Sequence, residues 1–362
     1  MIKNDSDLLN DFTITRNLKP ITQKSYRTSM NLYTEFNNTS FLSLITEAEE
    51  EENRQIRWKY RKIKQRLLKF RNYLTNTYKK NYAKITLSRV ITIYKHYEIE
   101  INTLPPISSK NHNESAPITF DDLPTKVIIR RALKKSGPMM KAIILFMSSS
   151  GCARRETLNL SVQDIIDSTK DYHEECDIYE IIDLLKSRND IVPTFKLKRQ
   201  KTNKYYYTFC SPEAIKQILK HLKTRKDLKP DDKVFPIHVE TFNRNFKKLN
   251  SQLKLGKAGC YCRFRSHNLR KYHASNLKND GMSMTDINAL QGKSKNAVDE
   301  SYFFENPQTL KKEYVKHLPA ITVLDKQNKR KIKSSEIIRL EIENKKLKKE
   351  IINLKEKFNI VP

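Results

Sequence analysis

The chain has 362 residues, of which 70 are Lys or Arg and 41 are Asp or Glu, so its formal net charge is +29. With 38% hydrophobic residues and only 6 Gly, it is not a collagen-like, low-complexity or wholly disordered chain. A size of about 100 to 200 residues per domain favours two domains over one. The cationic excess predicts a polyanionic partner, either nucleic acid or an anionic membrane surface.

Targeting signals and cysteines indicate the compartment. No apolar stretch of membrane-spanning length occurs, and the start MIKNDSDLLNDF has no signal-peptide core, so we expect a soluble, cytoplasmic protein without a membrane partner. The five cysteines are an odd, scattered set: Cys152, Cys176, Cys210, Cys260 and Cys262. A CxC pair near His267 lacks the second ligand pair of a typical zinc site, so we expect reduced thiols and no bound metal.

Residues from 12 to about 103 carry helical periodicity and little else. In the run RQIRWKYRKIKQRLLKFRNYLTNTYKK, apolar residues recur every three or four positions, at Ile56, Tyr60, Ile63, Leu67 and Phe70. Such a stripe faces a core while the surrounding Lys and Arg residues face outward. We therefore expect a small helical bundle over residues 1–105, whose basic face either contacts phosphates or is a solvated surface.

A linker follows this bundle. The segment LPPISSKNHNESAPI at 104–118 contains three prolines and has no apolar period. Proline-rich polar sequence of this kind predicts a linker, which we place at 106–118. A second domain is then expected over 119–325.

The second domain has a mixed pattern. Asp121 or Asp122 with Pro124 suits a helix start, MMKAIILFMSSSG predicts a buried helix that ends at Gly151, and RRETLNLSVQDII predicts another helix. The run DIYEIIDLL predicts a strand, and IVPTFKLKRQ and KYYYTFC predict a hairpin around a TNK turn. Helical segments follow from SPEAIKQILKHLK onward, so the fold class is mainly α with a small β-sheet (α+β).

Residues 331–358 contain a heptad repeat. Leu340, Leu347 and Leu354 fall at d, with Asn344 among apolar residues at a. Ile at a, Leu at d and one Asn at a favour a parallel two-stranded coiled coil. With about three heptads, the alternative is a short helix packed on its own domain or a neighbour's. Either way, the apolar stripe needs a partner, and we expect an oligomerisation or docking helix.

Five segments occur in a specific order: GCARRETLNL from 151, RQKTNKYYYTF from 199, HNLRKYHAS from 267, LQGK from 290 and ESYF from 300. Each alone is a weak signal. In this order they resemble the tyrosine recombinase family, also called the phage integrase family, and most closely its archaeal and archaeal-virus integrases. The resemblance covers about residues 118–320, and LKPITQKSYRTSM near the N-terminus resembles part of the family's core-binding domain.

The resemblance implies a catalytic set of Arg154, Lys201, His267, Arg270, Lys293 and Tyr302. Arg154 fits the first arginine, Lys201 the hairpin lysine, His267 and Arg270 the HxxR motif, Lys293 the LGH histidine and Tyr302 the nucleophile. His273 is expected to be structural, and Tyr205, Tyr206 and Tyr207 to pack within the hairpin.

Two features depart from the family pattern. The pattern GxRxxE would place its arginine at Ala153, so the motif is shifted by one residue and Arg155 competes with Arg154. Glu156 resembles the motif's acidic residue and could orient Arg154. Lys293 replaces the usual His or Trp, which keeps a hydrogen-bond donor but changes its length and charge.

The chemistry implied by the resemblance suits these residue types. Guanidinium groups such as those of Arg154 and Arg270 can clamp the charge that grows on a phosphodiester under attack. The Tyr302 phenol must lose a proton, for which His267 is a partner, and Lys201 can protonate the departing 5′ oxygen. The bond energy is kept in a 3′-phosphotyrosine linkage, so no cofactor, ATP or metal is expected.

We therefore expect a site-specific DNA recombinase, such as an integrase of a mobile element or virus, acting on double-stranded DNA with specific attachment sites. The resemblance implies a homotetramer on two duplexes with a Holliday junction intermediate. One alternative is the same chemistry used by a type IB topoisomerase or a dimer-resolving enzyme. Another is a noncatalytic DNA-binding relative.

Overall fold

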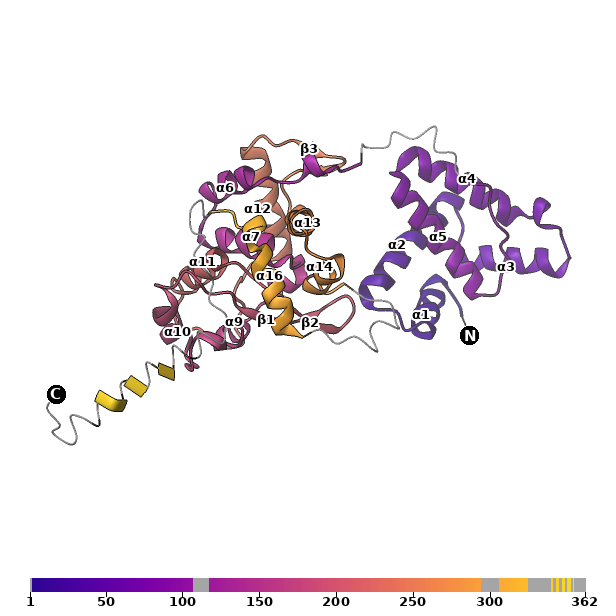
Figure 1. Ribbon diagram of the computed structural model, residues 1–362. Helices are drawn as coiled ribbons and strands as arrows, with labels where there is room; N and C mark the ends of the chain where they lie inside the picture. The colour runs from indigo at the N-terminus through magenta and orange to yellow at the C-terminus, as the bar shows by residue number, and fades with distance from the viewer. Residues whose placement is uncertain are drawn as a thin grey trace. The chain divides into compact units, whose positions relative to one another are not determined.

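The computed structural model describes residues 2–106, 117–293 and 306–324, together with scattered positions between 340 and 354. The chain separates into two compact units, Met1–Ser115 and Ala116–Pro362 (Figure 1). The predicted nucleophile and almost all of the predicted coiled coil lie outside the described residues. Among the helices that are described, none is long and apolar enough to cross a lipid bilayer.

The first unit is a helical bundle, as its periodicity predicted. Its helices are α1 (Asp5–Thr15), α2 (Pro20–Asn37), α3 (Phe41–Asn53), α4 (Lys62–Thr77) and α5 (Lys80–His96). All five contribute apolar side chains to one buried core. The Asp5 carboxylate of α1 accepts hydrogen bonds of 2.9 Å from the backbone N–H groups of Phe41 and Leu42. An anion at a helix N-terminus is stabilising, so Asp5 joins α1 to the start of α3.

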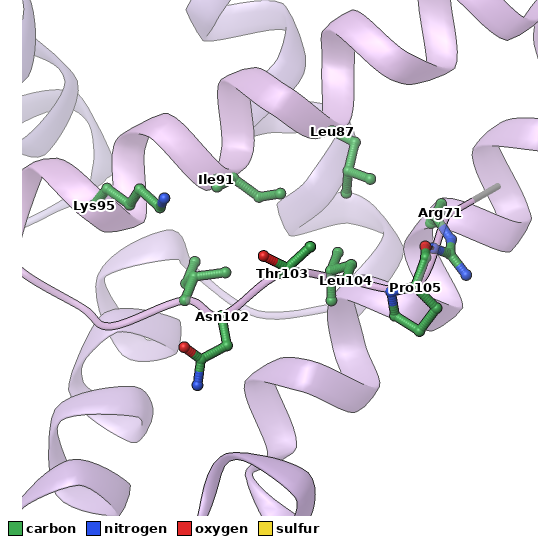
Figure 2. A pocket seen from close by; sticks show the side chains of 9 residues that line it. Arg71, Leu87, Ile91, Lys95, Asn102, Thr103, Leu104 and Pro105 are labelled. Carbon is green, nitrogen blue, oxygen red and sulfur yellow. Dashed lines mark hydrogen bonds between the residues drawn. The ribbon is translucent and has the colours of Figure 1, made fainter.

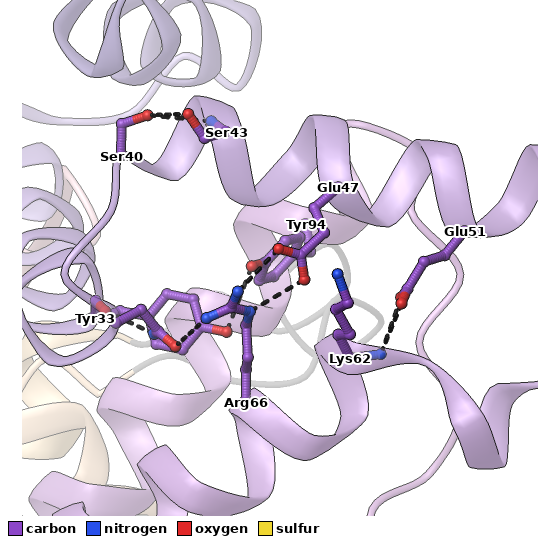
Figure 3. A network of polar contacts seen from close by, with 9 residues as sticks. Tyr33, Ser40, Ser43, Glu47, Glu51, Lys62, Arg66 and Tyr94 are labelled. Atoms are coloured by element: carbon purple, nitrogen blue, oxygen red, sulfur yellow. Dashed lines mark hydrogen bonds and ion pairs between the residues drawn. The ribbon is translucent and has the colours of Figure 1, made fainter.

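A half-buried polar network links α2, α3 and α4 (Figure 3). Arg66 donates two hydrogen bonds to the Glu47 carboxylate, of 3.2 and 2.8 Å, and a third to Asn37. Beside it, the hydroxyl of Tyr94 donates to that of Tyr33 at 3.4 Å. Burial raises the pKa of Tyr33 to about 12. The bidentate pair therefore joins α3 to α4, and the bond to Asn37 adds α2.

The predicted apolar stripe is correct for Ile63, Leu67 and Phe70, which are buried, but wrong for Tyr60, whose side chain is 64% exposed. Tyr60 belongs to a short 3₁₀ segment, Trp58–Tyr60, and α4 begins only at Lys62. Arg61 between them is extended and donates to the Ile56 carbonyl and to Glu52. This break takes Tyr60 out of the helical stripe.

The end of the first unit crosses α5. Residues 101–105 line a pocket of about 280 Å³ together with Arg71, Leu87, Ile91 and Lys95 (Figure 2). Arg71 donates to the Pro105 carbonyl. The chain is thus held to its own bundle up to the residue before the predicted linker.

The second unit is built around α7 (Pro138–Ser150), in which ten residues are buried. The other helices are α6 (Lys126–Lys134), α8 (Arg154–Asn159), α9 (Val162–Thr169), α10 (Ile178–Leu185), α11 (Pro212–Leu222), α12 (Val239–Gln252), α13 (Ser266–Asn279), α14 (Met284–Leu290) and α16 (Pro307–Ile321). The strands are β1 (Thr194–Arg199), β2 (Lys204–Phe209), β3 (Lys257–Ala258) and β4 (Tyr261–Cys262). Helices α11 and α13 pack on α7. This arrangement confirms the predicted mainly α class with small antiparallel sheets.

The strand predicted for DIYEIIDLL is wrong, because this run forms helix α10. Its buried residues are Ile178, Ile181, Ile182 and Leu185, a helical spacing of three and four. The Asp177 side chain accepts hydrogen bonds from the N–H groups of Tyr179 and Glu180 and caps the helix. The cap and the period outweigh the β propensity of the isoleucines. The predicted helix start at Asp121 or Asp122 is also only a short 3₁₀ turn, and α6 begins at Lys126.

The predicted hairpin forms. Strands β1 and β2 pair antiparallel, with Leu197 opposite Tyr206 and Arg199 opposite Lys204. Phe195 and Leu197 are buried while Lys196 and Lys198 are exposed, so Arg199 lies on the inward side of the strand. The next turn carries Lys201 away from the core.

Gly151 ends α7 with a φ of +66°, the left-handed conformation that favours glycine. The fully buried ring of His273 on α13 packs against it. Gln291 donates to Nδ1 of the neutral ring at 3.2 Å. Burial, together with the charges of Arg270 and Lys293, lowers the pKa of His273 to about 3.

Gly151→Ala should destabilise the protein more than Gly256→Ala. Both glycines have a positive φ, of +66° and +69°. A Cβ at Gly151 would lie 2.5 Å from His273 Nδ1, whereas nothing lies within 4 Å of one at Gly256. Strained overpacking costs about 1–3 kcal/mol. We therefore expect Gly151→Ala to lose about 2 kcal/mol more free energy of unfolding than Gly256→Ala, measured by urea denaturation. Equal losses would show that the contact with His273 is unimportant.

The pKa of His273 also predicts a loss of stability in mild acid. Its folded pKa of about 3 lies below the ordinary value of 6.5, so the unfolded chain binds the proton first as the pH falls below 6.5. By pH 5 this single group should remove about 2 kcal/mol from the free energy of unfolding. Between pH 7 and pH 5, the free energy of unfolding of His273→Asn should fall correspondingly less than that of wild type, measured by urea titration. An identical pH dependence in the two proteins would contradict the assignment.

Candidate active site

Arg270 of α13 is the centre of the site. It is 8% exposed, and its guanidinium donates to the carbonyls of Gly151 at 2.5 Å and Gln291 at 2.7 Å. The Gln291 side chain donates back to the Arg270 carbonyl at 3.1 Å. The group is therefore held between the end of α7 and the end of α14. Burial and the nearby Arg199 guanidinium lower the pKa of Arg270.

Glu156 and Arg199 form a second charged pair. Glu156 is the third residue of α8, and its carboxylate accepts a hydrogen bond of 2.7 Å from Arg199 at the end of β1. The two side chains are 2% and 17% exposed. The expectation that Glu156 orients Arg154 is thus wrong, because its partner is Arg199. The alternation of FKLKR was the available signal, since it places Arg199 on the inward face.

Arg154 begins α8, but its side chain reaches toward α12. Its guanidinium donates to the Asn243 side chain at 3.0 Å, and Arg154 is half-buried. The competitor Arg155 is exposed. The structure thus joins Arg270 with Arg199 and Glu156, while Arg154 has a different partner.

His267 lies in the first turn of α13, three residues before Arg270, and is more exposed than its neighbours. Burial of part of its ring lowers its pKa, and the positive charges of Arg265, Lys271 and Arg270 act in the same direction. The imidazole is therefore neutral at pH 7 and can accept a proton.

Both lysines of the predicted set lie within the described residues. Lys201 is exposed in the turn of the β1–β2 hairpin. Lys293 follows α14, and its ammonium donates to the Asn288 side chain at 3.0 Å. Partial burial and the charge of Arg270 lower the pKa of Lys293. Tyr302 lies outside the described residues.

The site is strongly cationic and suited to an anion. Arg270, Arg199 and Lys293 lie near one another, and Glu156 is the carboxylate bonded to this group. Within residues 2–106, 117–293 and 306–324, no three His, Cys, Asp or Glu side chains are grouped to hold a metal ion. Planar guanidinium and ammonium donors in a partly dry site are well matched to a phosphate group.

Comparison with known structures supports the fold. Lambda integrase in a dimer bound to a COC′ core site is 12% identical, with a TM-score of 0.54 over 84% of this chain and 98% of that one. XerH recombinase bound to its difH substrate is 13% identical, with a TM-score of 0.51 over 86% of this chain and 84% of that one. No curated protein matches the sequence.

The family model described as "Phage integrase family" matches residues 125–308, about half of the chain. The matched segment contains Arg154, Lys201, the HxxR motif, Lys293 and Tyr302. The chain therefore belongs to the phage integrase family, the tyrosine-type site-specific recombinases.

Proposed function

We propose that this protein cleaves and rejoins double-stranded DNA at specific attachment sites through a 3′-phosphotyrosine intermediate. The observation that carries the proposal is the buried guanidinium of Arg270. Its direct partners are two backbone carbonyls rather than a carboxylate, so its positive charge is not neutralised by them. A buried cation of this kind favours an anionic ligand, and a DNA phosphate is the anion that the family's reaction requires.

The proposed reaction begins at Tyr302. Its phenol transfers a proton to His267 and attacks the scissile phosphorus, forming a phosphorus–oxygen bond to the tyrosine. The bond from phosphorus to the 5′ oxygen breaks, and Lys201 donates the proton that this oxygen takes up. Attack by a 5′ hydroxyl of another strand reverses these steps and releases Tyr302. No electron acceptor or nucleotide is consumed.

The other residues stabilise charge in this scheme. Arg270 binds a nonbridging oxygen of the phosphate through the N–H groups that do not donate to the Gly151 and Gln291 carbonyls. Lys293 is a further donor to the same phosphate. The second guanidinium comes either from Arg154, which is next to the motif position Ala153 in the sequence, or from Arg199, whose charge acts on Arg270.

The proposal extends to assembly and source. A lambda integrase tetramer bound to a Holliday junction has the same fold, with a TM-score of 0.53 at 13% identity over 84% of this chain and 80% of that one. We propose a homotetramer on two duplexes, acting in the cytoplasm on the nucleoid or on the DNA of a mobile element. We also propose that it lies near the archaeal and archaeal-virus integrases within the family, on the resemblance of its five motif segments. The coiled coil over 331–358 is proposed as a contact between copies.

Tyr302→Phe should abolish covalent attachment to DNA. Wild-type protein is incubated with supercoiled plasmid and with a pool of nicked duplexes of randomised core sequence, then denatured in SDS. We expect labelled DNA to move with the wild-type protein and not with Tyr302→Phe, because phenylalanine has no nucleophilic oxygen. Tyr205→Phe is the matched control, since Tyr205 is 64% exposed on β2 and should keep the adduct.

The same assay separates the alternative functions. Relaxation of any supercoiled plasmid, without selection of particular duplexes, would indicate a topoisomerase. Binding to DNA with no adduct on any duplex would indicate a noncatalytic relative.

Binding to DNA should depend steeply on salt. Each phosphate neutralised contributes about −0.9 to the slope of log K against log salt. Lys201→Gln should therefore make the slope shallower by about one, measured by fluorescence anisotropy from 50 to 300 mM salt. Lys170→Gln is the control, because Lys170 lies outside the five motif segments, and it should leave the slope unchanged. A salt-independent affinity would be incompatible with phosphate contacts.

A further inference from the structure

In this chain an alanine, Ala153, occupies the motif position of the first arginine. In the spacing GxRxxE, counted from Gly151, the arginine position is Ala153 and the acidic position is Glu156. Ala153 is the N-cap of α8 and Glu156 is the third helical residue. Residues three apart lie on the same face of a helix, so an arginine at Ala153 would stand beside Glu156. The carboxylate is in place while the expected guanidinium is absent.

Arg199 supplies a guanidinium to that carboxylate from another element. It approaches from the end of β1, which packs against α8, and donates to Glu156 Oε1 at 2.7 Å. The other oxygen, Glu156 Oε2, is buried and has no hydrogen-bond partner in the described part of the chain. Glu156 thus holds Arg199 through a single hydrogen bond.

The hairpin is fixed against the loop that holds Arg270. Tyr206, opposite Leu197 on the inward face, packs so closely on Gly292 that a Cβ there would lie 2.7 Å from its ring. The carbonyl of the preceding residue, Gln291, accepts a hydrogen bond from Arg270. The Tyr206 hydroxyl also lies 3.5 Å from Cys152 Sγ, next to Gly151, whose carbonyl accepts the other bond from Arg270. Arg199 and Arg270 are therefore fixed in one rigid cluster.

We propose that Arg199 is a catalytic residue and acts as the second guanidinium on the scissile phosphate, with Glu156 as its positioning residue. The inference rests on the proposed function above. Arg199 binds a nonbridging oxygen while Tyr302 attacks and the 5′ oxygen departs, and it takes no part in proton transfer. The bond to Glu156 uses one of its five N–H donors, and its side chain is still 17% exposed, so a phosphate can reach it.

Arg154 is oriented differently from Arg199. Its guanidinium is bonded to Asn243 on α12, and it follows Ala153 by one residue, about 100° farther around the helix. It therefore points away from the face that carries Glu156. In this scheme Arg154 contacts DNA beside the cleavage point rather than the reacting phosphate.

The test removes the negative charge that Arg199 is proposed to neutralise. A nicked duplex selected by the wild-type protein from the randomised pool is prepared in two forms, with a phosphodiester or a methylphosphonate at the cleavage position. Rates of adduct formation are measured in single turnover for wild type, Arg199→Ala, Arg154→Ala and Arg188→Ala. Arg188 is the matched control, because it is a half-buried arginine paired with Asp190 just before β1.

On the phosphodiester we expect Arg199→Ala to react at least about 100-fold more slowly than wild type, as for loss of one charge-stabilising donor. On the methylphosphonate the difference should shrink to about 10-fold or less, because the missing cation has no charge to neutralise. Arg188→Ala should match wild type on both. Arg154→Ala should lose activity equally on both forms, through weaker DNA binding.

Other results would overturn the proposal. They are an Arg199→Ala rate within about threefold of wild type, an equal defect on both duplexes, or a selective methylphosphonate rescue of Arg154→Ala. If wild type forms no adduct, the proposed function falls and this inference falls with it. A wild-type adduct with unimpaired Arg199→Ala removes only the inference.

A second variant separates catalysis from folding. Arg199→Ala leaves Glu156 buried without a partner, so Glu156→Gln/Arg199→Ala is measured alongside it, with thermal unfolding of each protein. The double variant should unfold near the wild-type temperature and still show the slow phosphodiester reaction with methylphosphonate rescue. A double variant with restored phosphodiester activity would show that Arg199 serves only to neutralise Glu156.

Discussion

The hydrogen bonds from Arg270 to two backbone carbonyls are the constraint on which the site depends. They join the end of α7, the body of α13 and the loop after α14, three segments far apart in sequence. Burial disfavours the charged guanidinium, yet its direct partners carry no negative charge. The fold thus places an incompletely compensated cation at a fixed point. That arrangement lowers the stability of the free protein, and the binding of an anion offsets this loss.

The segments that hold Arg270 are also packed together by the surrounding core. His273 packs on Gly151 and accepts from Gln291, so the two segments that hold Arg270 are also held by a buried neutral ring. Tyr206 packs on Gly292 and brings the hairpin, and with it Arg199, to the same place. The first unit has its own core and its own bidentate pair, Arg66 with Glu47.

Sequence reasoning predicted the features that depend on local pattern. The left-handed Gly151, the buried α7 and the β1–β2 hairpin have unambiguous signals. The failures occurred where two local signals compete, as in α10, where a cap at Asp177 and helical spacing override isoleucine-rich sequence. In the site, the proximity of His267 and Arg270 could be predicted, because the HxxR motif lies within one helix. The pairing of Glu156 with Arg199 was not, because 43 residues separate them and only tertiary packing brings them together.

Strand β1 alternates strictly, with Phe195, Leu197 and Arg199 facing inward and Lys196 and Lys198 stacked over Tyr205 outside. A one-residue insertion or deletion within such a strand exchanges its two faces. Here that slip would bury a lysine that now covers the tyrosine ring and turn Arg199 to solvent. Length changes in the turn between 199 and 204 leave the alternation intact. Insertions at the tip of this hairpin therefore spare the inward face of β1, whereas insertions within the strand reverse it.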